Sequence, residues 1–242
     1  MQRKSRATSE WKRGYRPGTF SIAAYDAKAE ALGVAVATGI VAVGATCPYV
    51  SDTAAVVTQS FTKTTHGSDV LSRVADGEGI ESACESVLAR DEHSSYRQLH
   101  GVERDDGQYT FTGDNCVDWC GSTTGPKHSV AGNMLDGSAV VDAVRDAFTT
   151  STGSLPDRLL SGLEAGQEAG GDKRGKVSSA LLVHAPEPKL YHNLRIDAAE
   201  HPIRKLRELY ERAYETQQNL QDETSRQLGS YPDEILEFGV KY

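Results

Sequence analysis

Apolar residues gather in three short runs near the start of the chain, each of the length of a β-strand. Residues 19–25 alternate as Thr-Phe-Ser-Ile-Ala-Ala-Tyr, whereas residues 32–38 and 54–60 consist almost continuously of small or apolar side chains. Continuous runs of this kind are typical of strands that are covered on both faces of a sheet. The polar segment 26–30 predicts a hairpin turn between the first two strands.

Longer segments with helical spacing alternate with further strands. Helices are predicted at 67–76, at 80–88, at 138–148, from Ser154 onward with Pro156 in the first turn, and at 201–215. Further strands are predicted at 101–103, 109–112, 129–135, 177–184 and 190–196. Pairs of helices therefore separate groups of strands. This order favours an α+β fold in which two sheets pack together with helices outside, a four-layer α/β/β/α sandwich.

Charge divides the chain into unequal parts. Residues 1–18 carry six basic side chains against Glu10 alone, and the rest of the chain carries a net charge of −13 within the overall −8. We interpret residues 1–18 as a basic leader, either a propeptide or the product of a misassigned start, and residues 19–216 as one domain. Residues 217–242 are predicted to be a polar, flexible tail, in which 231–238 could dock. The acidic body argues against nucleic acid as a partner.

The sequence also argues against a membrane-spanning helix and a metal site. No apolar run reaches the roughly 18 residues that a spanning helix needs, and the leader lacks the apolar stretch of a secretory signal. We therefore expect a cytoplasmic protein without membrane association, whose cysteines are reduced. Cys116 and Cys120 have a spacing that fits neither a zinc finger nor a thioredoxin motif, and the seven histidines are scattered. We expect no metal and no cofactor. The apolar face of the last helix is compatible with a homo-oligomer.

Thr19 is the candidate nucleophile. It follows Gly18 and opens the first predicted strand. If the bond between these residues is cut, one residue carries both a hydroxyl and a free α-amine, which can act together as nucleophile and base. The α-amine has an ordinary pKa of about 8, so a useful neutral fraction exists at pH 7. The same position also suits an ordinary strand threonine.

Polar side chains at the ends of other strands could complete a site. Gln59 and Ser60 end the third strand, where they could bind substrate or simply cap the strand. Asn133 lies where a strand meets a helix, and its amide could donate to a developing oxyanion or cap the turn.

A glycine-rich segment, residues 165–178, leads from a predicted helix into a predicted strand. It lacks the ending of a phosphate-binding P-loop. Its Asp172 and Arg174 form either a charged loop in solvent or a buried pair that holds the N-terminal residue in place, and Ser178 is a further candidate for substrate binding.

Eight strings occur in an order that resembles the DUF1028 family: TFSIAAYD, LGVAVAT, AVGATCP, VVTQS, TGDNCVDW, GPKHSVAGNML, EAGQEAGGDKRGKVSSALLV and LRID. The resemblance covers roughly residues 19–215. Members of that family look like N-terminal-nucleophile (Ntn) hydrolases in fold, and many begin Met-Thr-Phe-Ser, so that removal of Met leaves Thr first. The matching residue here is Thr19. Its extension implies either self-cleavage at the Gly18–Thr19 bond or a misassigned start.

The residues and the resemblance together predict an Ntn-type amidohydrolase that acts on a small amide, a γ-glutamyl-type compound or a peptide. The predicted roles are nucleophile and base for Thr19, oxyanion donor for Asn133, orientation of the α-amine for Asp172 and Arg174, and substrate binding for Gln59, Ser60 and Ser178. Two alternatives remain open. One is a non-catalytic binding or scaffold protein on the same fold, and the other is a hydrolase that uses Cys47 or Cys116.

Overall fold

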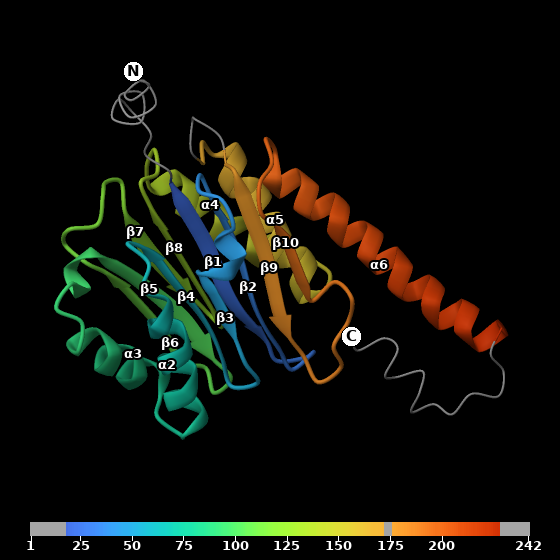
Figure 1. The fold of residues 1–242 in the computed structure, drawn as a ribbon, viewed down its shortest axis with the longest axis horizontal. Helices are drawn as coiled ribbons and strands as arrows, with labels where there is room; N and C mark the ends of the chain where they lie inside the picture. The colour runs from blue at the N-terminus through green and yellow to red at the C-terminus, as the bar shows by residue number, and fades with distance from the viewer. Residues whose placement is uncertain (1–17, 172–175, 228–242) are drawn as a thin grey trace, which may run out of the picture.

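The computed structural model describes residues 18–171 and 176–227, with side-chain detail as far as residue 219, and its ten described strands form two antiparallel sheets (Figure 1). The six-stranded sheet has the order β10-β9-β2-β1-β8-β7, with β1 (Thr19–Asp26), β2 (Ala31–Thr38), β7 (Gly121–Gly125), β8 (His128–Asn133), β9 (Ser178–His184) and β10 (Asn193–Ile196). The four-stranded sheet has the order β3-β4-β5-β6, with β3 (Pro48–Val50), β4 (Ala54–Ser60), β5 (Arg97–Glu103) and β6 (Gln108–Thr112).

Helices cover the outer face of each sheet. The helices against the four-stranded sheet are α2 (Thr64–Ala75) and α3 (Ile80–Ala89), and those against the six-stranded sheet are α4 (Ser138–Thr150), α5 (Leu155–Glu168) and α6 (Pro202–Gln227). Two short 3₁₀ turns, η1 (Val43–Ala45) and η2 (Ser94–Tyr96), lie in connections. The predicted α+β sandwich with layers in the order α/β/β/α is thereby confirmed.

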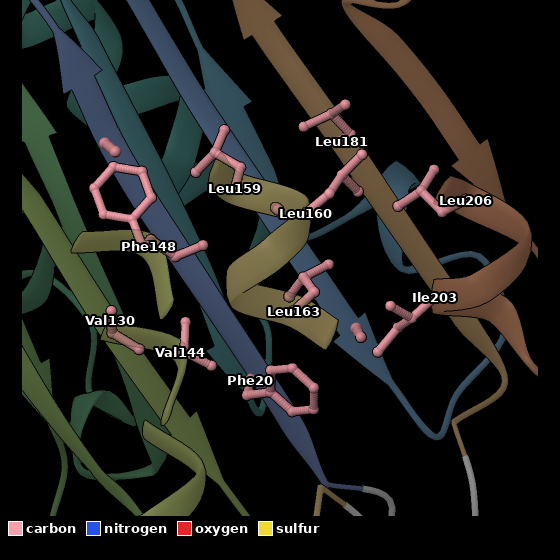
Figure 2. Close-up of a cluster of buried hydrophobic side chains, with 14 of the residues drawn as sticks. Phe20, Val130, Val144, Phe148, Leu159, Leu160, Leu163, Leu181, Ile203 and Leu206 are labelled. Atoms are coloured by element: carbon pink, nitrogen blue, oxygen red, sulfur yellow. The ribbon is translucent and has the colours of Figure 1, made fainter. Parts of the chain in front are cut away.

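The apolar residues form three clusters, one in each gap between layers. The largest lies between the six-stranded sheet and its helices, where Leu159, Leu160 and Leu163 of α5 pack over the sheet beside Phe148 of α4 (Figure 2). A second cluster fills the gap between the two sheets, and a third lies beneath α2 and α3. Burial of these side chains is the main force that holds the layers together.

Alternation along β1 sends its side chains to two different layers. Phe20 and Ile22 belong to the cluster beneath the helices, whereas Ala23 belongs to the cluster between the sheets. Because successive side chains of a strand point to opposite faces, Thr19 and Ser21 share the face of Ala23 and point toward the second sheet. The strand therefore presents its hydroxyls to the gap between the sheets.

Two local signals in the sequence have their expected effect. The Asp26 carboxylate accepts hydrogen bonds from the backbone N–H groups of Lys28 and Ala29, at 3.0 and 3.3 Å, and so closes the turn between β1 and β2. The Ser154 hydroxyl accepts from the backbone N–H of Asp157 and caps α5, as predicted.

Some predicted boundaries differ from the structure. The strand β7 was not predicted because its sequence, Gly121–Gly125, is polar, as suits a strand at the edge of a sheet. The short strand β3 also escaped prediction, since three residues show no periodicity. The strand expected at 129–135 ends at Asn133, because Met134 adopts a left-handed backbone with φ of 55° and turns the chain.

The last helix is longer than predicted. We expected it to end at Glu215 and a flexible tail to begin at Gln217, but α6 continues to Gln227. Residues 216–227 contain no proline or glycine, and four of them are Gln, which favours helix. The Gln217 side chain is buried and accepts a hydrogen bond from the Leu190 N–H at 3.0 Å, which ties this part of α6 to the body. The predicted docking segment 231–238 lies outside the described residues.

Candidate active site around Thr19

Four polar side chains lie in one row across the six-stranded sheet. The register of the strands places Thr19 opposite Thr38 of β2 on one side and Asn133 of β8 on the other, and Thr38 in turn lies opposite Ser178 of β9. Residues that pair directly in a sheet share a face, so all four side chains point toward the four-stranded sheet. The structure therefore brings together Thr19, Asn133 and Ser178, which the sequence placed far apart.

The Thr19 hydroxyl is held by its neighbour. Its Oγ1 lies 2.8 Å from Oγ1 of Thr38, within hydrogen-bonding distance, and Thr19 is only 8% exposed. A hydroxyl that is held in this way has a restricted orientation, which is what a nucleophile in a preorganised site requires. The sequence does not distinguish Thr38 as a site residue, because a threonine at the end of a strand carries no distinctive signal.

Asn133 is buried, and its side-chain oxygen Oδ1 has no hydrogen-bond partner among the described residues. A buried, unsatisfied polar atom is costly and rare, so each one calls for a ligand or a functional explanation. The register of β8 fixes this carboxamide beside Thr19. It is therefore available to a group that approaches the Thr19 hydroxyl or its backbone nitrogen.

The carbonyl oxygen of Gly18 accepts two hydrogen bonds. One comes from the ammonium of Lys176, with Nζ at 2.7 Å, and the other from the backbone N–H of Gly39, with the nitrogen at 3.2 Å. The Lys176 side chain is buried, and Nζ lies 4.9 Å from the centre of the Phe20 ring, in the range of a cation–π contact. Two donors on one carbonyl, one of them charged, polarise the peptide bond between Gly18 and Thr19.

No role for Lys176 is predicted from the sequence. Its only signal was its place in the glycine-rich segment that precedes the strand Ser178–His184, and a lysine there also fits a solvent-exposed loop. The two charged residues that were predicted in the same segment, Asp172 and Arg174, lie outside the described residues.

Ser178 supports a neighbouring loop. Its hydroxyl donates to the carbonyl of Ile40 at 2.5 Å and accepts from the backbone N–H of Val43 at 3.1 Å. Through these two bonds, the start of β9 holds both the residue that lies two positions beyond Thr38 and the first residue of η1. Within the described structure, Ser178 thus positions the loop that follows β2.

Gln59 belongs to a chain of buried hydrogen bonds between the sheets. Its Nε2 donates to Oε1 of Gln98 at 2.7 Å, and the Nε2 of Gln98 donates to the backbone carbonyl of Gly132 at 3.0 Å. On the other side, Ser21 Oγ donates to Gln59 Oε1 at 2.7 Å. Gln59 and Ser21 therefore connect the strand of Thr19 to the second sheet.

The same chain ends at a neutral histidine. The Nε2 of His100 lies 2.8 Å from Ser21 Oγ, and its Nδ1 lies 2.9 Å from Ser129 Oγ. Because Ser21 uses its proton on Gln59, it must accept from His100, which assigns the proton to Nε2 and leaves Nδ1 as an acceptor. Burial lowers the pKa of His100 to about 3, so the ring is uncharged near neutral pH.

Ser60 ends β4 with a left-handed backbone, φ 67°, and its buried hydroxyl has no hydrogen-bond partner among the described residues. The next residue is Phe61, whose carbonyl accepts from the guanidinium of Arg97 at 2.6 Å. Arg97 is itself paired with the buried carboxylate of Asp91, with Nε 2.8 Å from Oδ2. Burial acts to raise the pKa of Asp91, but the hydrogen bonds and charge of its partners, Arg97 foremost, lower it to about 2.

The two cysteines that could act as alternative nucleophiles are both buried thiols. Burial raises the pKa of Cys47, which disfavours the reactive thiolate. The Sγ of Cys116 donates to the carbonyl of Arg97 at 3.3 Å.

A cavity of about 450 Å³ lies on the other side of the six-stranded sheet from the Thr19 hydroxyl. Residues of α5 and α6, including Glu164 and Arg207, line it together with His201 and Lys176. Lys176 thus reaches both this cavity and the Gly18 carbonyl.

In the part of the chain that the structure describes, the His, Cys, Asp and Glu side chains form no group of three or more that could bind a metal. Nor does any described helix have the length and apolarity to cross a membrane.

The fold and the row of polar side chains define an α/β/β/α sandwich protein with a strand-initial threonine between two antiparallel neighbours. The chain belongs to the DUF1028 family, described as a family of unknown function, whose model matches residues 19–206. A solved structure of the same family, protein SPO2555 from Silicibacter pomeroyi, is similar to it with a TM-score of 0.76 and 34% identity, over 81% of this chain and 86% of that one. A search of curated proteins gives no match.

Proposed function

We propose that the protein is an amidohydrolase whose nucleophile is Thr19, made N-terminal by removal of residues 1–18. The observation that carries this proposal is the environment of the Gly18–Thr19 bond, where the carbonyl accepts from Lys176 and Gly39 and the following hydroxyl is held by Thr38. The match to the family model, which begins at Thr19, also supports it.

Self-cleavage is the first step of the proposal. Thr19 Oγ1 attacks the carbonyl carbon of Gly18, and the oxyanion that forms is stabilised by the Lys176 ammonium and the Gly39 N–H. The C–N bond breaks as the hydroxyl proton passes to the departing nitrogen, which leaves an ester between Gly18 and the Thr19 side chain. Water then hydrolyses the ester, which releases the Gly18 carboxylate and frees the hydroxyl and α-amine of Thr19.

In the mature protein, the freed amine becomes the base for the hydroxyl of the same residue. The positive charge of Lys176 nearby disfavours the protonated amine and so increases the neutral fraction at pH 7. The Thr19 hydroxyl attacks the amide carbonyl of a small substrate, Asn133 contributes to binding of the oxyanion, and water resolves the acyl-enzyme. Asp172 and Arg174 are proposed to orient the amine. The chemistry uses no metal or organic cofactor.

The test combines two measurements on the purified full-length chain. Intact mass and N-terminal sequencing are expected to give a chain that begins at Thr19. The Thr19→Ala variant is expected to stay uncut, whereas Thr19→Ser, which keeps a hydroxyl, is cut. Turnover of small amide substrates should follow the same order. Removal of residues 1–18 from the Thr19→Ala variant at a normal rate would contradict self-cleavage.

A misassigned start makes a separate prediction. A chain expressed as Met followed by Thr19 is expected to lose Met and to have the same activity as the self-cleaved protein. Equal inactivity of both forms would favour the non-catalytic alternative. Turnover that survives Thr19→Ala but is lost on alkylation of thiols would favour Cys47 or Cys116 as the nucleophile.

A further inference from the structure

Exposed apolar side chains gather at the end of the sandwich that contains Thr19. Among the described residues, five large apolar side chains are strongly exposed. Four of them lie at this end of the sandwich, just after β2, just after β4 or just before β5. We call these four the apolar rim: Ile40 (54% exposed), Val41 (60%), Phe61 (50%) and Tyr96 (41%). The fifth, Tyr214, lies on α6. Clustered exposed apolar residues commonly mark a binding surface.

Cross-sheet hydrogen bonds show that Phe61 lies at the Thr19 end. Ser21 of β1 donates a hydrogen bond to Gln59 of β4. Gln98 of β5, which pairs with Gln59 in the second sheet, donates to the carbonyl of Gly132. Gly132 of β8 in turn pairs with Phe20 of β1. Two residues from Ser21 toward the start of β1 lies Thr19, and two residues from Gln59 past the end of β4 lies Phe61. The second sheet therefore ends in the apolar rim at the level of the candidate nucleophile.

The other half of the rim lies next to the bond that is proposed to be cut. Gly39, whose N–H donates to the Gly18 carbonyl, is followed directly by Ile40 and Val41. The loop that begins there approaches the second sheet at its far end, where Sγ of Cys47 is 4.0 Å from Oγ1 of Thr62. The two halves of the rim thus lie at the same end of the sandwich, one after β2 and the other at the ends of β4 and β5.

The rim is held in place by the body of the protein. The Ile40 carbonyl accepts from Ser178, and the Phe61 carbonyl accepts from Arg97. The rings of Phe61 and Tyr96 meet edge to face, with centroids 5.7 Å apart. A rigid apolar surface loses little conformational entropy when it binds a ligand, which favours affinity.

Hydroxyls and carboxamides lie between the rim and the deeper core. The gap between the sheets at this level contains the hydroxyls of Thr19 and Thr38 and the carboxamides of Asn133, Gln59 and Gln98. Hydroxyls and carboxamides can bind an amide group by hydrogen bonds.

We infer that the substrate is an amide whose acyl group is apolar, with the amide at Thr19 and the acyl side chain against the apolar rim. This inference rests on the proposed function and narrows its substrate class. It disfavours γ-glutamyl-type compounds, because the ammonium and the carboxylate of their acyl part would lie against the apolar side chains of the rim. It also gives Phe61 and Ile40 the role of selecting the substrate.

The test compares two chromogenic amides, phenylacetyl-p-nitroanilide and γ-glutamyl-p-nitroanilide, on the protein that begins at Thr19. The phenylacetyl compound is expected to have a kcat/KM at least about tenfold higher, since one apolar group in a matching site commonly contributes that much. Phe61→Ala and Ile40→Ala are expected to raise its KM about 5- to 20-fold with kcat changed less than about twofold, as loss of uniform binding requires. Tyr214→Ala, a matched exposed aromatic outside the rim, should change neither constant.

Each contrary outcome identifies which idea fails. Equal cleavage of the two anilides, or preference for the γ-glutamyl compound, would overturn the inference and leave the proposed function intact. If neither is cleaved, labelling of the Thr19 hydroxyl by a small β-lactone, read by intact mass, decides the matter: labelling overturns the inference alone, and its absence overturns both. Rim variants that alter the oligomeric state on gel filtration but not KM would reassign the rim to contacts between copies.

Discussion

Thr19 and Thr38 face each other across the central pair of strands in the six-stranded sheet, with their hydroxyl oxygens 2.8 Å apart. The antiparallel register of β1 and β2 fixes this distance, because both residues lie at the ends of strands that are paired over their whole length. Hydroxyls on directly opposed residues can hydrogen-bond across the ladder. Thr38 is therefore a positioning residue for the proposed nucleophile.

We predict that Thr38→Val slows self-cleavage at Gly18–Thr19 and turnover about tenfold, because loss of one orienting hydrogen bond is equivalent to about 1.4 kcal/mol. The rate is measured by intact mass over time after refolding. A matched control is Thr58→Val, since Thr58 is also a buried strand threonine but donates to the Lys63 carbonyl at 3.4 Å. An equal effect of the two substitutions would remove the positioning role of Thr38.

Lys176→Met is predicted to slow self-cleavage by about 100-fold or more, because removal of one oxyanion donor commonly has an effect of this size. Lys176→Arg keeps a cationic donor and should retain part of the rate. Lys127→Met serves as the control, because Lys127 also lies over an aromatic ring, 5.3 Å from the centre of Tyr25, at the opposite end of β1. A normal rate in Lys176→Met, with the fold intact by circular dichroism, would contradict the proposed cleavage mechanism.

Ser178→Ala is predicted to lower the free energy of unfolding by about 1–2 kcal/mol, because it leaves two backbone groups without their partner. It should also speed amide hydrogen exchange at Val43, whose N–H donates to the Ser178 hydroxyl. Ser179→Ala is a close control. The Ser179 hydroxyl is equally buried but donates to the Pro202 carbonyl at 2.9 Å, so its loss should spare exchange at Val43. Unchanged exchange in Ser178→Ala would show that another contact holds the loop.

Stability is predicted to fall as pH decreases below 6.5, in part through His100. Its folded pKa of about 3 lies below the ordinary 6.5 because of burial, so the unfolded chain binds a proton between these values and the folded chain does not. Each such histidine lowers stability by up to about 1.4 kcal/mol per pH unit in that window. His192, with a pKa lowered by burial to about 4, acts in the same direction.

Urea unfolding of wild type and His100→Gln at pH 7, 6 and 5 isolates the contribution of His100. The wild type is expected to lose more stability than the variant on acidification. Identical slopes would mean that His100 is protonated in the folded state within this range.

Cys47→Ala is predicted to leave both self-cleavage and turnover unchanged within about twofold. The thiol is buried and its pKa is raised by burial, so it offers little thiolate to attack a carbonyl. Iodoacetamide should accordingly modify it slowly in the folded protein, as measured by mass. Loss of turnover in Cys47→Ala, combined with turnover that persists in Thr19→Ala, would transfer the nucleophile to the cysteine.

Local sequence signals were sufficient to predict those strands whose pattern of apolar residues does not depend on a neighbouring strand. Alternation over residues 19–25 and the apolar runs at 32–38 and 54–60 identified β1, β2 and β4, because a strand repeats every two residues whatever it packs against. The strands at Pro48–Val50 and Gly121–Gly125 were missed, since short or polar edge strands acquire their structure from a neighbour.

The amino-acid sequence by itself determined the layered class of the fold and identified Thr19, Asn133 and Gln59 as residues of interest, because hydrophobic periodicity and strand ends are local properties. Only the tertiary structure decided which of them meet. Asn133 lies beside Thr19 through the register of β8, and Lys176 reaches the Gly18 carbonyl from 158 positions along the chain. Such contacts depend on strand order and register, which are set by the packing of whole layers and are not encoded in the spacing of any one segment.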